Sequence, residues 1–242
     1  MSKQLQDSRI DNHEELYWID NAYCGMPTYQ LGAKYPYDVL TPIHKILKFL
    51  PHPSYMTFIY MLGFYIFILS LGFKNRFAFF GAICYGLSTY LLIIIQVGHN
   101  TKSVALGYLP LVFASLNYIF KNKSIWPLIL LSLFMGLQIR ANHYQITYYM
   151  FILIGIFMGF KLFESFRHKQ LKSFGSKTLK IFFSVLIALG LNATSIFSTY
   201  EYSKYSTRGK SDITIDESGR LLEINDGLSY DYITQFSMGI FE

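Results

Sequence analysis

The sequence has little charge and few cysteines. Only 15% of its 242 residues are charged, whereas soluble domains carry about 25%. Cys24 lies in a polar segment and Cys84 in an apolar run, so we expect no disulfide between them. The chain contains no His-Glu-x-x-His motif, no closely spaced cysteine pair and no glycine-rich phosphate loop. These absences argue against a soluble domain and against the common metal- and nucleotide-binding motifs.

Long apolar runs fill the centre of the chain, and 52% of all residues are hydrophobic. A membrane-spanning helix needs about 20 apolar residues, because the hydrocarbon core is about 30 Å thick. The six runs, of which the fourth is short, cover residues 54–73, 77–97, 104–120, 125–139, 144–163 and 179–199. We predict an all-α, polytopic membrane protein with about six transmembrane helices in residues 54–199, between polar segments at 1–53 and 200–242.

Basic residues concentrate in alternate loops. The loops at 74–76, 121–123 and 161–180 hold ten of the 21 Lys and Arg residues and one acidic residue, Glu164. The loops at 98–103 and 140–143 hold one basic residue each. Because short basic loops stay in the cytoplasm, both termini and the latter loops are predicted to be extracytoplasmic. The net charge of +6 is therefore a topology signal, and no nucleic-acid partner is expected.

The polar segments at the two ends of the chain predict that it is part of a longer polypeptide. The polar N-terminal segment of about fifty residues would have to cross the membrane without a signal peptide. The C-terminal segment stops in a predicted loop. We therefore interpret the chain as an internal piece of a larger membrane protein, with an upstream helix.

Polar residues gather on the predicted extracytoplasmic side. Arg140, Asn142 and His143 interrupt apolar sequence, and ionisable groups near hydrocarbon cost about 2.5–3.5 kcal/mol each unless they line a cavity. Arginine suits phosphate, and His99 and His143 could transfer protons or bind an anion. An acid in the first segment, such as Asp20, could serve as a general base.

Each of these residues also has a structural interpretation that the sequence leaves open. The histidine at 99 and the asparagine after it fit a helix cap. The guanidinium at 140 fits a side chain that extends to the membrane interface. Asp20 fits an ordinary loop position.

Several of these stretches carry a resemblance to a known family. The chain resembles the YfhO-like bacterial membrane proteins, which look like glycosyltransferases of the GT-C architecture. The matching stretches include Tyr17-Trp18, Gly25-Met26-Pro27-Thr28-Tyr29-Gln30, Leu62-Gly63-Phe64-Tyr65, Gly86-Leu87-Ser88-Thr89-Tyr90, Gly98-His99-Asn100-x-Lys102, Ala141-Asn142-His143-x-Gln145, Tyr200-Glu201-Tyr202 and Ser206-Thr207-Arg208-Gly209. In the family a transmembrane helix and an acidic motif come first, and neither precedes Leu16 here.

The resemblance implies transfer of a sugar from a polyprenyl phosphate to a cell-envelope polymer at a bacterial cytoplasmic (inner) membrane. It implies a donor-phosphate site of Arg140, Lys102 and His99, oriented by Asn142, His143 and Asn100. Glu201 and Arg208 would lie on the acceptor side, with Asp20 as the candidate base. A divalent metal fits such a scheme, but no motif indicates one.

Two other classes of function stay open at this point. A lipid or solute transporter should carry ionisable residues near the bilayer midplane, on broken helices. The centres of the predicted helices are nearly free of charge, which favours chemistry at one membrane face. A non-catalytic assembly scaffold would depend on the same polar residues for complex formation only.

Overall fold

The computed structural model describes residues 3–22, 24–122, 124–205 and 234. The chain forms two compact units, of which the larger spans Tyr35–Ala193. The smaller unit combines the described residues up to Lys34 with those from Thr194 onward.

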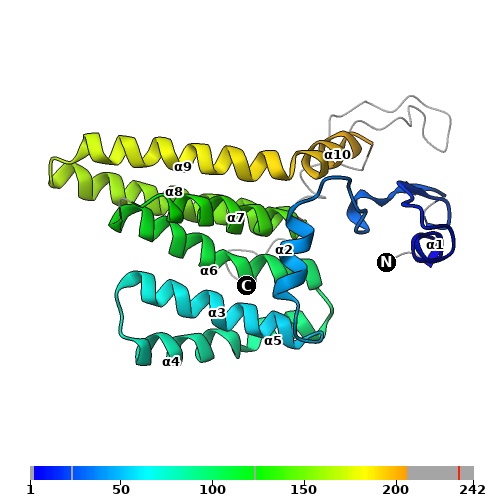
Figure 1. The fold of residues 1–242 in the computed structure, drawn as a ribbon, viewed down its shortest axis with the longest axis horizontal. Helices are drawn as coiled ribbons and strands as arrows, with labels where there is room; N and C mark the ends of the chain where they lie inside the picture. Colours follow the sequence, from blue (N-terminus) through cyan, green and yellow to red (C-terminus); the bar gives the residue numbers. More distant parts are fainter. Residues whose placement is uncertain (1–2, 23, 123, 206–233, 235–242) are drawn as a thin grey trace. The chain divides into compact units, whose positions relative to one another are not determined.

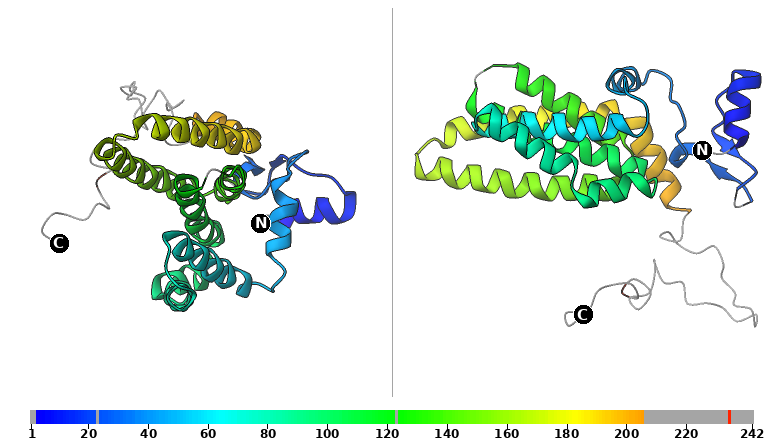
Figure 2. Two further views of the ribbon diagram at one scale, coloured as in Figure 1. Left: turned by 60° about the vertical axis from the view of Figure 1, so that its left-hand side comes forward. Right: turned by 90° about the horizontal axis from the view of Figure 1, so that it is seen from below.

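The larger unit is a bundle of helices that run side by side, with one short helix across their ends (Figure 1). In Figure 2, α3 and α4 lie on one side of α6, and α7 to α9 lie on the other. The helices are α2 (Leu40–Leu47), α3 (Ser54–Leu71), α4 (Asn75–Gly86), α5 (Thr89–Gln96), α6 (Asn100–Lys121), α7 (Trp126–Arg140), α8 (Tyr144–Arg167) and α9 (Leu171–Leu191).

The central helix of the bundle is α6, whose side chains Tyr108, Val112 and Leu116 are fully buried. It crosses α3 closely, because both helices have glycine at the crossing. A Cβ placed on Gly63 would lie 2.9 Å from the carbonyl oxygen of Gly107. Small residues allow helix backbones to approach in this way, as is common between helices in membranes.

Several helices are long and apolar enough to cross a membrane, which indicates a membrane protein. Within the described residues there are four such helices, α3, α6, α8 and α9, or five if α4 and α5 count as one bent span. The prediction of six is therefore not reproduced. One reason is that α7 has only 15 residues. The other is that the predicted run at 77–97 breaks into two helices, which meet at an angle of 43°.

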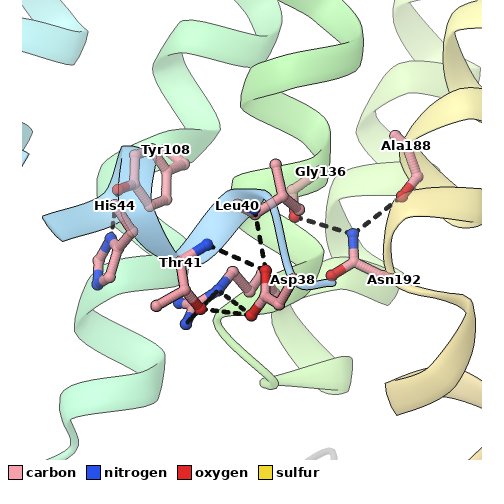
Figure 3. Close-up of polar contacts among 9 residues, drawn as sticks. Asp38, Leu40, Thr41, His44, Tyr108, Gly136, Ala188 and Asn192 are labelled. Carbon is pink, nitrogen blue, oxygen red and sulfur yellow. Dashed lines mark hydrogen bonds and ion pairs between the residues drawn. The ribbon is translucent and has the colours of Figure 1, made fainter. Parts of the chain in front are cut away.

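The sixth predicted run, 179–199, also differs from the structure. Helix α9 begins eight residues earlier than 179, at Leu171, and ends at Leu191. Asn192 follows it, and its side-chain Nδ2 donates to the carbonyl oxygens of Gly136, at 3.0 Å, and Ala188, at 2.9 Å (Figure 3). This buried amide joins the end of α9 to α7. A new helix, α10 (Ala193–Ser203), follows.

The three basic loops lie at the same end of the bundle, which we call the basic end (Figure 1). Lys121 Nζ donates to the carbonyl oxygen of Ser70 at 2.7 Å, and Lys177 Nζ donates to that of Phe120 at 2.8 Å. Both acceptors belong to the last turn of a helix, where the dipole favours a cation. We call the opposite end the α2 end.

The smaller unit contains short elements: α1 (Lys3–Asp7), a π-helical turn (Ser8–Asn12), β1 (Trp18–Ile19), β2 (Met26–Pro27) and a 3-10 turn (Thr28–Gln30). The two strands pair antiparallel, with Trp18 opposite Pro27. Arg9 forms an ion pair with Glu15. The segment that we predicted as one polar stretch, 1–53, is thus divided, because α2 folds with the bundle.

Candidate functional site

Helix α2 starts at an aspartate that the sequence analysis did not select. Asp38 Oδ1 accepts hydrogen bonds from the backbone N–H groups of Leu40, at 2.9 Å, and Thr41, at 3.0 Å. An aspartate placed before the first turn satisfies N–H groups that have no partner inside the helix. Asp38 therefore fixes where α2 begins.

Arg140, the last residue of α7, is bonded to the start of α2. Its Nε lies 3.3 Å from Asp38 Oδ2 and donates to Thr41 Oγ1 at 3.1 Å, and its Nη2 donates to the same hydroxyl. Figure 3 shows Asp38 just before α2 and Thr41 in the first turn of α2. The side chains of Arg140 and Asp38 are 27% and 22% exposed. The guanidinium thus holds α2 against α7.

The charge on Asp38 is stabilised by these partners. Burial raises the pKa of the carboxyl, but the hydrogen bonds from Thr41 and the positive charge of Arg140 lower it, and the net pKa is below its usual value. Asp38 is therefore ionised at neutral pH, with its oxygens engaged by Leu40, Thr41 and Arg140. Asp38 therefore anchors the start of α2 to α7.

A second buried contact holds the middle of α2. His44 Nδ1 and Tyr108 Oη share a hydrogen bond of 2.7 Å (Figure 3), and His44 is only 7% exposed. Burial lowers the pKa of His44 to about 4, and the charges of Lys48 and Arg140 act in the same direction, against that of Asp38. The imidazole is therefore neutral at pH 7.

The buried imidazole predicts a pH dependence of stability. Its pKa is about 4 in the folded chain and 6.5 in the reference state, so the unfolded chain binds the proton more tightly. The contribution of His44 is complete above pH 6.5 and is lost as the pH falls toward 4, at about 1.4 kcal/mol per pH unit at most. Chemical unfolding in detergent micelles at several pH values between 6.5 and 4 should show this decrease in the free energy of unfolding.

The control for this measurement is His44→Asn, which keeps a polar group but removes the titration. Other groups, including His143, contribute equally to both proteins, so the difference between the two curves reports His44 alone. If the free energies of unfolding of the two proteins change in parallel from pH 7 to pH 4, the pH dependence does not come from His44.

The loops that start α6 and α8 bring three predicted site residues together. Burial lowers the pKa of His143, and Lys102 and His99 lower it further, while its own backbone hydrogen bond opposes this. His143 Nδ1 also accepts a weak hydrogen bond of 3.4 Å from the backbone N–H of Ile146, which caps α8. Groups from the loop that starts α6 thus act on an imidazole in the loop that starts α8, at the α2 end.

Two further contacts connect this cluster to its surroundings. The Asn100 side-chain oxygen lies 3.2 Å from His52 Nε2, and Lys102 Nζ lies 5.3 Å from the centre of the Tyr90 ring. Asn142 sits at a left-handed backbone position, φ 58°, where α7 turns into α8. That conformation is tolerated best by glycine and asparagine.

The remaining predicted residues belong to the smaller unit or lie outside the described residues. Asp20, in the smaller unit, is exposed, and its Oδ1 accepts a hydrogen bond of 3.0 Å from Trp18 Nε1. Glu201 is exposed on α10, and Arg208 lies outside the described residues. Within those residues no group of three His, Cys, Asp or Glu side chains could hold a metal ion.

Sequence reasoning missed Asp38, Thr41, His44 and Tyr108. A signal for the first two was present, since Asp38-Val-Leu-Thr41 followed by apolar residues at 43 and 47 is typical of a helix start. The contact between His44 and Tyr108 joins residues 64 apart in the chain. No local pattern indicates such a pair.

At the α2 end, the chain therefore offers His99, Lys102 and His143 at the beginnings of two long helices. Helix starts carry partial positive charge and N–H groups without a partner inside the helix, so together with the lysine at 102 they favour an anionic ligand. The charge of Arg140 is offset by that of Asp38. A comparison of the chain with protein-family models, with curated proteins and with solved structures finds no match.

Proposed function

We propose that this chain belongs to a membrane glycosyltransferase-like protein that binds a polyprenyl-phosphate-linked sugar at the α2 end of the bundle. The observation that supports it is the cluster of His99, Lys102 and His143 at the starts of α6 and α8. The reaction type comes from the resemblance to the YfhO-like family. The acceptor would be a hydroxyl of a cell-envelope polymer outside a bacterial cytoplasmic membrane.

The proposed chemistry explains why cations are needed. The acceptor oxygen bonds to the anomeric carbon as the bond from that carbon to the phosphate oxygen breaks. The lipid phosphate leaves with the electron pair, and the acceptor proton passes to a base. Positive groups that contact the leaving phosphate stabilise the charge that develops on it. Lys102 supplies the positive charge, His99 and His143 supply ring nitrogens for hydrogen bonds, and Asn100 and Asn142 are orienting groups.

This proposal gives Arg140 a different role from the contact with the donor phosphate that the resemblance implied. Its Nε and Nη2 already bind the first turn of α2. We assign the phosphate to the Lys102 cluster first, and we assign to Arg140 the placement of α2 beside that cluster. Asp20 stays the candidate base, and Glu201 and Arg208 stay candidates for contact with the acceptor.

The test is replacement of Lys102 by Ala in the full-length protein. Loss of one charge-assisted hydrogen bond is worth about 1.5–3 kcal/mol, so glycosylation of the acceptor polymer should fall on the order of ten- to a hundred-fold. Polymer glycosylation is compared at equal amounts of membrane-inserted protein. Lys102→Arg keeps the charge and should retain most of the activity.

The matched control is Lys172→Ala, because Lys172 is an exposed lysine near the basic end. This variant should be as active as the unmodified protein. Full activity of Lys102→Ala, or an equal loss in both variants, would contradict the phosphate assignment.

The orientation belongs to the same proposal: the α2 end is extracytoplasmic and the basic end is cytoplasmic, as alternate basic loops predict. Cysteine at the exposed position Thr101 should react with an impermeant thiol reagent in intact cells, whereas cysteine at the exposed position Ser173 should not. Both variants are made in a chain without Cys24 and Cys84, which are exposed. The reverse labelling pattern would overturn the orientation.

One observation favours a transporter as the second candidate, namely the bend of 43° between α4 and α5. Broken helices in transporters expose backbone groups and charged side chains to a substrate near the midplane. Residues 77–97, which contain this break, include no Asp, Glu, Lys or Arg. Substrate-dependent uptake by proteoliposomes, without glycosylation, would favour the transporter.

A further inference from the structure

We propose that α2 is an interfacial helix: it lies in the plane of the membrane surface, and the side that faces away from the bundle binds phospholipid. Helix α2 has eight residues and runs across the ends of the longer helices (Figure 1). This inference depends on the membrane alone and not on the proposed sugar transfer.

One side of α2 is committed to the bundle. Leu40 is 1% exposed and His44 is 7% exposed. Ile43 and Leu47 pack against the same apolar core. At 3.6 residues per turn these positions form one stripe along the helix. The ion pair from Asp38 and the hydrogen bond from His44 fasten this stripe to α7 and α6.

The apolar surface of α2 continues from the buried stripe onto one flank, which nothing in the described part of the chain covers. Val39 is 56% exposed, Ile46 is 73% exposed and Phe49 is 65% exposed. At about 100° per residue, Val39 and Ile46 follow Ile43 around the helix, and Phe49 comes just after the end of α2. An apolar arc that is wider than the part covered by the bundle, with lysines on the other side of the helix, is typical of a helix at a membrane interface.

The depth of this exposed side matches the edge of a bilayer. The rings of Phe49 and Phe58 pack edge to face, with their centres 5.2 Å apart. Phe58 is the fifth residue of α3, which is one of the helices long enough to span a membrane. It lies about 6 Å along α3 from the first residue. Interfacial helices bury their apolar side about 5–10 Å into the region between head groups and acyl chains.

The charges on α2 also fit phospholipid. Lys45 and Lys48 are exposed and lie on the other side of the helix axis from Val39 and Ile46. Long lysine side chains at this height can reach lipid phosphates while their stems stay near hydrocarbon. The exposed apolar side is continuous with α3 through the Phe49–Phe58 contact. The bilayer around α3 is therefore the surface that we assign to it.

The experiment uses the whole chain in nanodiscs, with Trp18 and Trp126 replaced by Phe and with Phe49→Trp as the reporter. Lipids brominated along their acyl chains quench tryptophan that touches them. We expect Phe49→Trp to lose as much emission as Phe79→Trp, which reports a residue of α4 that is 64% exposed. Lys45→Trp, on the polar flank of α2, should lose less.

The outcomes separate lipid from other partners. Unchanged emission of Phe49→Trp, with Phe79→Trp quenched, would overturn the proposal. Ile46→Cys, in a chain without Cys24 and Cys84, tests a second copy: efficient disulfide-linked dimers would assign the exposed side to that copy instead. If Phe49→Trp lowers the melting temperature, Ile46→Trp replaces it as the reporter, and quenching of its emission by brominated lipid tests the proposal.

Discussion

Arg140→Ala is expected to lower the free energy of unfolding by about 2–3 kcal/mol, because it leaves the ionised Asp38 without its cationic partner. The side chains are 27% and 22% exposed, so water recovers part of the loss. Asp38→Ala should cost at least as much, since it also removes the cap of α2. Chemical unfolding in micelles measures both variants and the double mutant.

The double mutant identifies the interaction. If Arg140 acts through Asp38, the two losses are not additive, and the coupling energy should exceed about 0.5 kcal/mol. Arg76→Ala, at an exposed arginine near the basic end, is the control and should leave stability unchanged. Additive losses would show that Arg140 stabilises the chain by another contact.

The same pair separates an anchoring role from a phosphate-binding role. Asp38→Asn can still accept the N–H groups of α2, but it removes the negative charge. If Arg140 anchors α2, Asp38→Asn and Arg140→Ala should lower glycosylation by the same route and to a similar extent. If Arg140 binds phosphate directly, Asp38→Asn frees the guanidinium and activity should hold or rise, while Arg140→Ala loses it.

Gly63→Ala is expected to lower the free energy of unfolding by about 1–3 kcal/mol, the usual cost of overpacking. The new Cβ would lie 2.9 Å from the backbone oxygen of Gly107 and 3.4 Å from Leu111 Cγ. A backbone oxygen cannot turn aside as a flexible side chain can, so α3 and α6 must move apart. The loss should appear in the same unfolding measurement.

Gly155→Ala provides the matched control, since it makes the same change in the middle of α8. A Cβ there has nothing within 4 Å. Alanine is the better helix former, so this variant should be unchanged or more stable by up to about 1 kcal/mol. Equal behaviour of the two variants would mean that the close crossing of α3 and α6 contributes nothing to stability.

Sequence patterns determined the class of this protein and several of its helices. The apolar runs predicted helices close to the observed α3, α6 and α8, because an apolar stretch of that length must satisfy its backbone hydrogen bonds internally. The concentration of Lys and Arg in alternate loops predicted the loops that meet at the basic end. The loops at 98–103 and 140–143 were predicted to lie on one side of the membrane, and in the structure they start α6 and α8 at the α2 end, where Lys102 and His99 lower the pKa of His143.

Only the tertiary structure decided how these parts combine. Arg140 was expected to meet phosphate or the membrane interface, but its partner is Asp38, 102 residues away. Hydropathy records how apolar each position is, and it carries no information about which distant side chain lies opposite. The same holds for the break between α4 and α5 and for the amphipathic α2, whose exposed apolar flank becomes visible only once the bundle covers the rest of its apolar surface.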